Sequence, residues 1–414
     1  MKKILIVILA IALVLGGFFV YKKKNKIIDT RKTITFWSIQ LKPIYEVQMN
    51  NIIKQFENKH PDYKIQWIDI PINEAQKRTL ASILSSTPPD LINLNPDFSV
   101  LLAQKNTLEF LDDKDLSQFS PSLIENLKYD NKVYALPFYA TSAVTIYNKK
   151  NYDECFNKKF IKTYDEMFNI SSKFAQCSKI ATFAASLNEN ATTAKILNKY
   201  DISDYSTEKE KNLTSEIFSN LNKMYKNDEL PKDTMALSHR EVIEKYMAQK
   251  VNIIVAGANF IYMIKKSAPE VYENSEITNQ LTGKNGKYDI SLMNLIIPKR
   301  AKYKDLAFEF AQTLTNKENQ LEFAKLTNVL PANKYALSDP YFTTCEDDLY
   351  DKSRCISANQ LKKLNNTTFN EKYKKEINEV INKTLEEILL NPNTKEDDIV
   401  QKVDSLSEKI RLYN

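Results

Sequence analysis

Aromatic and polar side chains lie at the ends of two predicted strands, where a small polar molecule could bind. Trp37, Ser38 and Gln40 lie at and just after the end of the first predicted strand, and Asn95 and Asp97 follow the third. Ligands of open α/β sheets bind beyond the carboxyl ends of the strands, and these residues supply an aromatic face and hydrogen-bonding groups. They therefore predict a binding site. The alternatives are core packing for Trp37 and the capping of a turn or helix for Asp97.

The sequence lacks the motifs of common catalytic and cofactor sites. Its five glycines, two of them in an N-terminal apolar segment, cannot build a phosphate loop, a Walker motif or a dinucleotide fingerprint. His60 and His239 have no cysteine or carboxylate neighbours at metal-ligand spacing, and no nucleophile elbow occurs. Chance pairs among 52 acidic residues do not support a glycosidase, which needs two carboxylates across a cleft. We expect no enzyme activity, no cofactor and no metal site.

Four cysteines form two pairs that are close in sequence, Cys155 with Cys177 and Cys345 with Cys355. Three connectivities are possible, and this local one is the simplest. Each disulfide would close a short loop and contribute about 3 kcal/mol. Reduced, buried thiols are the alternative if the folded body lies in the cytoplasm.

Residues 1–32 form a predicted membrane element and a basic linker. Residues 4–21 carry no charge, and 18 residues span about 27 Å as a helix, enough for a thin bilayer. This predicts an uncleaved anchor, with a cleaved signal peptide as the alternative. Residues 1–32 also hold the basic excess, because the remaining chain has 50 basic and 51 acidic residues. The net charge of +6 therefore gives no support to nucleic-acid binding.

Strands and helices alternate along the chain. Strands predicted at 34–37, 64–70 and 91–94 are separated by segments with apolar residues at helical spacing. This order predicts a mostly parallel sheet with helices on its faces. Capping boxes at 163–166 and 238–241 predict the starts of two later helices. A chain of 414 residues is also too long for one core, so two lobes are expected.

The segment 133–150 is predicted to run from one lobe to the other. β-branched and aromatic residues dominate it, and Pro137 excludes a continuous helix. Small and hydroxylated residues at 140–143 interrupt the apolar run, as would suit a strand beside a polar cleft. An ordinary sheet strand entered through a proline turn is the alternative.

Taken in order, these segments resemble the extracellular solute-binding proteins of bacterial ABC importers, in the group that includes maltose-binding and glycerol-3-phosphate-binding proteins. The resemblance covers about residues 33–412. Each motif is weak alone, and the specificity lies in their order and spacing. The motifs stand at 34–37, 56–61, 89–92, 134–148, the helix after Thr163, 246–257, 295–298, 307–311 and 330–333.

The resemblance implies a two-lobed α/β fold of the periplasmic-binding-protein (Venus-flytrap) type, with mixed sheets and a helix-rich C-terminus. Lobe I would comprise 33–138 plus about 297–345, and lobe II 139–296 plus about 346–414. The chain would cross between lobes near 137–141 and again near 294–297.

The resemblance also implies a function. The protein would capture an extracytoplasmic sugar or oligosaccharide between its lobes and deliver it to an ABC permease, as a monomer held at the membrane by residues 4–21. The four lysines at 22–26 outweigh Lys2 and Lys3, so the positive-inside rule would instead place the body in the cytoplasm. The extracytoplasmic location of the family overrides that signal here.

The resemblance extends to individual residues. Asp97 matches a carboxylate position that holds sugar hydroxyls in the maltose-binding branch. Tyr139 and Thr141 lie on the crossing strand, and the lack of a carboxylate at position 141 leaves the ligand open.

Asn259, Phe260 and Tyr262 match a segment that often offers an aromatic platform. The tryptophan frequent in that segment is absent, so Phe260 or Tyr262 would stack on the sugar, with helix packing as the alternative for both.

Two other functions stay open at this point. The protein could sense a ligand for a separate receptor instead of importing it. It could also bind a polyol phosphate such as glycerol 3-phosphate, which would require a basic residue in the cleft; Arg300 and Lys42 are candidates.

Overall fold

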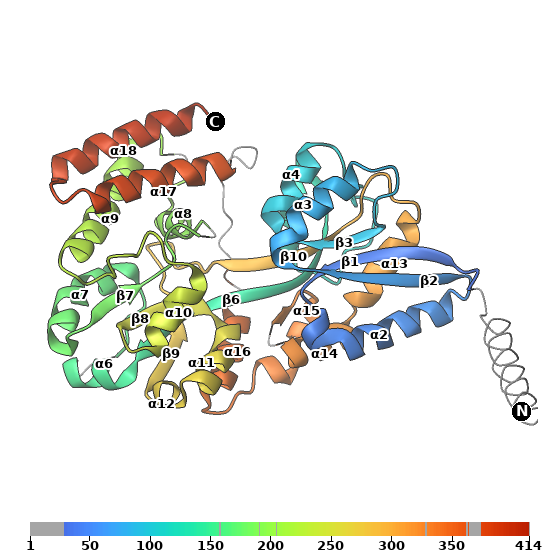
Figure 1. The fold of residues 1–414 in the computed structure, drawn as a ribbon, viewed down its shortest axis with the longest axis horizontal. Coiled ribbons are helices and arrows are strands. Elements are labelled where there is room, and N and C mark those ends of the chain that lie inside the picture. The colour runs from blue at the N-terminus through green and yellow to red at the C-terminus, as the bar shows by residue number, and fades with distance from the viewer. Residues whose placement is uncertain are drawn as a thin grey trace, which may run out of the picture.

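The chain folds into two α/β lobes joined by two long neighbouring strands (Figure 1). This confirms the predicted two-lobed α/β fold. Among the residues that are described, no helix has both the length and the apolar character needed to cross a membrane. The membrane helix predicted over 4–21 lies outside the described residues. The computed structural model describes residues 29–413 apart from 157–158, 190, 204, 328, 362 and 364–373.

Lobe I is built on parallel strands joined by helices, as the sequence predicts. Strand β1 (Lys32–Ile39) pairs in parallel with β2 (Tyr63–Ile70) and β3 (Leu91–Leu94). The connections are α2 (Lys42–Lys59) and α3 (Ile72–Ile83). The further elements of this lobe are α4 (Pro96–Gln104), α5 (Pro121–Glu125), β4 (Lys128–Tyr129), β5 (Lys132–Val133), β11 (Leu330–Pro331), α15 (Lys334–Leu337) and the 3₁₀ helix η2 (Pro340–Phe342).

Segments far apart in the sequence share the core of lobe I. The chain returns to this lobe in α13 (Lys304–Leu314) and α14 (Lys317–Thr327). The ring of Phe310 meets those of Phe36 and Phe56 edge-on, with centroids 5.5 and 5.2 Å apart. Because Phe36 lies on β1 and Phe56 on α2, these contacts fix the returning helix against the first β-α unit.

Lobe II surrounds a second set of strands. Strand β7 (Ala181–Ala184) pairs in parallel with β8 (Val251–Gly257), and β9 (Ser275–Asn279) lies on the other side of the crossing strand. The C-terminus is helix-rich, as predicted, with α17 and α18 lying over α9 (Figure 1). The helices of this lobe are α6 (Lys149–Cys155), α7 (Tyr164–Ser178), α8 (Thr192–Asn198), α9 (Glu208–Lys226), α10 (His239–Met247), the 3₁₀ helix η1 (Ala258–Phe260), α11 (Ile261–Ser267), α12 (Pro269–Glu273), α16 (Leu349–Leu361), α17 (Lys374–Leu390) and α18 (Glu396–Arg411).

Local signals in the sequence of lobe II are found in the structure. The hydroxyl of Thr163 accepts a hydrogen bond from the backbone N–H of Glu166 at the start of α7, and Ser238 does the same for Glu241 at the start of α10. Both predicted capping boxes are therefore confirmed. The cysteines are joined in the two sequence-local pairs, Cys155 to Cys177 and Cys345 to Cys355.

Strands β6 (Leu136–Asn148) and β10 (Ile290–Ile296) connect the lobes. Strand β6 pairs antiparallel with β10 as far as Ser142, and with β8 and β9 from Ala143 onward. The predicted crossings at 137–141 and 294–297 fall in β6 and at the end of β10. Because one sheet continues through both lobes, strand pairing does not define where a lobe ends, and the predicted lobe limits stay a prediction.

Candidate functional site

A cleft of about 470 Å³ lies in lobe II, beside the point where β6 changes partner. Ala185 and Ser186 directly follow β7, and Gly257 ends the parallel strand β8. The cleft therefore opens at the carboxyl ends of two parallel strands, where α/β sheets bind their ligands. It is lined by Thr141, Ser142, Ala143, Tyr164, Ala185, Ser186, Thr192, Lys195, Ile196, Lys199, His239, Val255, Gly257, Phe260, Gln280, Asp289 and Ser291.

One wall of the cleft combines an aromatic ring with an imidazole. Phe260 lies in the short 3₁₀ helix after β8, and its ring meets His239 edge-on at a centroid distance of 5.1 Å. Burial lowers the pKa of His239, and the positive charge of Lys195 acts in the same direction, while Glu189 opposes it. A neutral imidazole can both donate and accept a hydrogen bond. This wall therefore offers an apolar surface beside a neutral hydrogen-bonding group.

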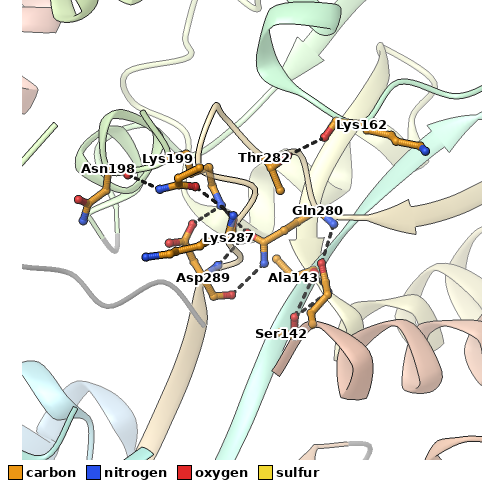
Figure 2. A network of polar contacts seen from close by, with 11 residues as sticks. Ser142, Ala143, Lys162, Asn198, Lys199, Gln280, Thr282, Lys287 and Asp289 are labelled. Carbon is orange, nitrogen blue, oxygen red and sulfur yellow. Dashed lines mark hydrogen bonds and ion pairs between the residues drawn. The ribbon is translucent and has the colours of Figure 1, made fainter. Parts of the chain in front are cut away.

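An ion pair between Lys199 and Asp289 forms part of the cleft lining, and Figure 2 shows its polar contacts. The ammonium of Lys199, whose side chain is only 2% exposed, lies 2.8 Å from Oδ2 of Asp289. Burial lowers the pKa of Lys199, and the attraction to Asp289 opposes this shift. An ammonium at this depth requires such a partner, because an isolated buried charge is strongly unfavourable.

Two residues predicted from the sequence line the cleft. Thr141 lies on β6 next to the point where this strand changes partner, and Phe260 lies in η1. Tyr139 is two residues from Thr141 but packs against Phe138 and Phe323, with ring centroids 5.1 and 5.2 Å away. Burial raises its pKa. Tyr139 therefore belongs to the core of lobe I and does not line this cleft.

Two other predicted residues of lobe I use their polar groups within the lobe. Ser38 is fully buried, donates to a carboxylate oxygen of Asp69 and accepts from the indole N–H of Trp67 at 2.7 Å. Asn95 is the N-cap of α4 and accepts from the backbone N–H of Phe98 at 2.9 Å.

Trp37 and Gln40 also lie outside the cleft lining. The ring of Trp37 lies 5.9 Å from the guanidinium carbon of Arg78 and packs against the core of lobe I. Its buried indole nitrogen has no hydrogen-bond partner within the described ranges. Gln40 is exposed, and its backbone N–H donates to the carbonyl of Ile70.

The remaining predicted residues separate into two groups. Tyr262 is 57% exposed outside the cleft lining, and its ring lies 6.2 Å from that of Tyr350. The backbones of Asp97 and Asn259 belong to α4 and η1, but their side chains lie outside what the structure describes.

Sequence reasoning missed most of the polar lining of the cleft. Lys195 and Lys199 lie one helical turn apart in and just after α8, whereas Asp289 comes from the segment before β10. No spacing rule joins positions about 90 residues apart. The available sign was local for Ser186, which closely follows the end of β7 as the predicted Phe260 follows the end of β8.

The chain matches the sequence profile of a family described as bacterial extracellular solute-binding proteins over residues 51–346. A putative binding protein of Brucella abortus (strain 2308) is 22% identical over 333 residues, which cover 77% of this chain and 80% of that protein.

Solved structures agree in fold. A putative oligosaccharide periplasmic-binding protein from Synechococcus sp. MITs9220 superposes with a TM-score of 0.80 at 22% identity, covering 92% of this chain and 99% of the other. Maltose-bound MalE3 of T. maritima superposes with a TM-score of 0.71 at 16% identity, covering 92% and 100%. At these identities the likeness establishes the two-lobed fold.

Proposed function

The chain belongs to the bacterial extracellular solute-binding proteins, and we propose that its solute is a sugar or an oligosaccharide. The observation that carries this proposal is the mixed lining of the cleft beside the crossing strands. The family is defined by the binding of solutes, in agreement with the expectation that the chain is not an enzyme.

The chemistry of the cleft suits a carbohydrate. Sugars present apolar C–H faces, which pack on aromatic rings, and hydroxyl groups, which need donors and acceptors around them. Phe260 supplies an aromatic surface, while His239, Ser186 and Thr141 supply neutral polar groups. A structural neighbour from T. maritima was solved with maltose bound, which supports the same class of solute.

Capture would involve closure of the two lobes. We expect the lobes to hinge where β6 and β10 run side by side, since these strands carry the chain between them (Figure 1). Lobe I would then approach the cleft with exposed groups such as Gln40, and with Asp97 and Trp37, beyond the ends of β1 and β3. The side chains of Asn95 and Ser38 form hydrogen bonds within lobe I. They would therefore support this face of the lobe without contacting the solute.

Delivery to an ABC permease completes the proposal. We infer that the folded body is extracytoplasmic and monomeric, and that residues 4–21 hold it at the membrane unless they are cleaved. A role in sensing would use the same cleft with a receptor in place of the permease.

A polyol phosphate is the second candidate solute, and Lys195 favours it. This lysine lines the cleft, and its ammonium makes no hydrogen bond or ion pair in the described part of the chain. A phosphate could therefore bind it directly. Lys42 and Arg300, the basic residues considered from the sequence, do not line the cleft; the ammonium of Lys42 lies over the ring of Trp67 at 5.2 Å.

Thermal unfolding of the full-length chain tests the proposal and separates the two solute classes. The protein would be kept in a detergent without a sugar headgroup and screened against neutral sugars, oligosaccharides, polyols and glycerol 3-phosphate. A solute at 100 times its Kd stabilises the folded state by about 2.7 kcal/mol, which raises Tm by several degrees in a chain of this size. An unchanged Tm with every solute, in a sample that unfolds cooperatively, contradicts the proposal.

A further inference from the structure

Asp289 occupies the point where the chain leaves lobe II for the second connecting strand. It directly precedes Ile290, the first residue of β10, and Ile290 pairs with Ser142 on β6. Its side chain is 19% exposed and lines the cleft. A carboxylate here is accessible to a bound solute and close to both connecting strands.

The ammonium of Lys199 holds this carboxylate in place, and all three of its hydrogens have partners within the protein. It lies 2.8 Å from Oδ2 of Asp289, and it donates to Oε1 of Gln280 at 2.9 Å and to the carbonyl of Lys287 at 3.5 Å (Figure 2). An ammonium has three hydrogens, so none is left for a solute. The other carboxylate oxygen of Asp289, Oδ1, accepts no hydrogen bond from the residues that the structure describes.

Gln280 and Gln360 connect the ion pair to the crossing strand. The side-chain Nε2 of Gln280 donates to the backbone carbonyl of Asp289 at 2.9 Å. Its Oε1 accepts from the backbone N–H of Asp289 at 3.1 Å. The backbone N–H of Gln280 donates to Oε1 of Gln360 at 2.8 Å. Gln360 in turn donates to the hydroxyl of Ser142 and the carbonyl of Ala143, both at 2.8 Å. The position of Asp289 is thereby tied to the residues where β6 changes partner.

The turn that carries this network needs a glycine. A Cβ atom at Gly283 would overlap the backbone carbonyl of Lys199, so only glycine lets the turn after Gln280 approach the end of α8. The backbone N–H of Asn285 also donates to that carbonyl at 3.1 Å. The close approach keeps Lys199 buried beneath the segment that ends in Asp289.

We propose that Asp289 binds the solute by accepting hydrogen bonds from its hydroxyl groups through Oδ1, and that Lys199 is the positioning residue for this carboxylate. The inference rests on the proposed function. Because Lys199 already balances the negative charge, the pair favours neutral hydroxyl donors over a cation. Asp289 thus selects polyhydroxy solutes at the point where the chain enters the second connecting strand.

Calorimetric titration of the full-length chain with glucose, maltose, cellobiose and mannitol tests this assignment. The tightest binder is then compared with its monodeoxy analogues. We expect Asp289→Asn to weaken binding by about ten- to a hundredfold, the usual range for a hydrogen bond to a charged acceptor. We also expect wild type to discriminate against the analogue lacking the contacted hydroxyl, and the variant to lose that discrimination. A purely structural role would weaken all analogues by one common factor, and that result overturns the proposal.

Matched variants guard against loss of folding. Asp404→Asn removes one of the two carboxylate partners of another lobe II lysine, Lys211, outside the cleft and should leave every Kd unchanged. Lys199→Met/Asp289→Asn removes both charges of the pair and should bind as weakly as Asp289→Asn, with the same loss of discrimination. If wild type binds a sugar and either Asp289 variant binds it within twofold, the inference fails alone. If wild type binds no sugar or polyol, the proposed function fails as well.

Discussion

The two lobes use similar residue types after their strands in opposite ways. In lobe I, the hydroxyl of Ser38 is buried and forms hydrogen bonds with Trp67 and Asp69. The carboxylate of Asp69 also accepts hydrogen bonds from the backbone N–H groups of Leu41 and Lys42 at the start of α2. In lobe II, the polar groups after the strands face a cleft. A polar residue beyond a strand therefore marks the edge where ligands bind, but the nearby helix ends decide whether it is free to bind one.

The largest effect expected from this comparison concerns the buried pair of lobe II. The side chain of Lys199 is only 2% exposed, and Asp289→Asn removes the carboxylate that balances its charge. This change should reduce the free energy of unfolding by about 3–5 kcal/mol. Adding Lys199→Met removes the uncompensated charge and should restore most of the loss. Denaturation in urea measures both variants. Equal stabilities of the single and the double variant would show that the pair is not electrostatically coupled.

Ser38→Ala should have the next largest effect, and only on stability. The change leaves a carboxylate oxygen of Asp69 and the indole N–H of Trp67 without their buried hydroxyl partner. The free energy of unfolding should therefore fall by about 1–3 kcal/mol. Because Ser38 is fully buried, the affinity for the solute should stay unchanged. A large loss of affinity with normal stability, seen by urea unfolding and calorimetry together, would place Ser38 in the binding site after all.

Phe260→Ala should do the opposite and weaken the affinity for the solute more than the stability of the fold. Its effect should be the smallest of the three. Loss of the aromatic surface beside the sugar should raise Kd by about tenfold, if the contact contributes on the order of the 0.5–1.5 kcal/mol known for a pair of aromatic rings. Tyr262→Ala is the matched control, because Tyr262 is an aromatic residue two positions away that is 57% exposed outside the cleft. Calorimetry that finds the larger effect for Tyr262 would reverse our assignment of the stacking residue.

The sequence predicts the scaffold of this protein well and its binding cleft poorly. Strand–helix alternation, the two capping boxes and the crossing strand depend on neighbours within a few residues, and all are found in the structure. Ser38 was predicted as a ligand contact, but its partner Asp69 comes from a neighbouring strand that spacing alone does not align with it.

The polar network of the cleft shows the same limit more strongly. Lys199 follows α8, Asp289 precedes β10 and Gln360 lies on α16, so tertiary folding alone brings them together. Thr141 and Phe260 could be predicted because the crossing strand and the end of a strand each have a local signature. Lys199, Asp289 and Gln360 had no such local signature in the sequence.

Hydrogen exchange of the full-length chain, with and without the sugar that stabilises it, shows directly whether the solute binds in the lobe II cleft. If the solute binds in the lobe II cleft, protection should increase around the lining residues of three segments: Ala185 to Lys199, Val255 to Phe260, and Gln280 to Ser291. Protection confined to lobe I, or to the separate groove around Asp233 and Lys245, would show that the solute does not bind in the lobe II cleft.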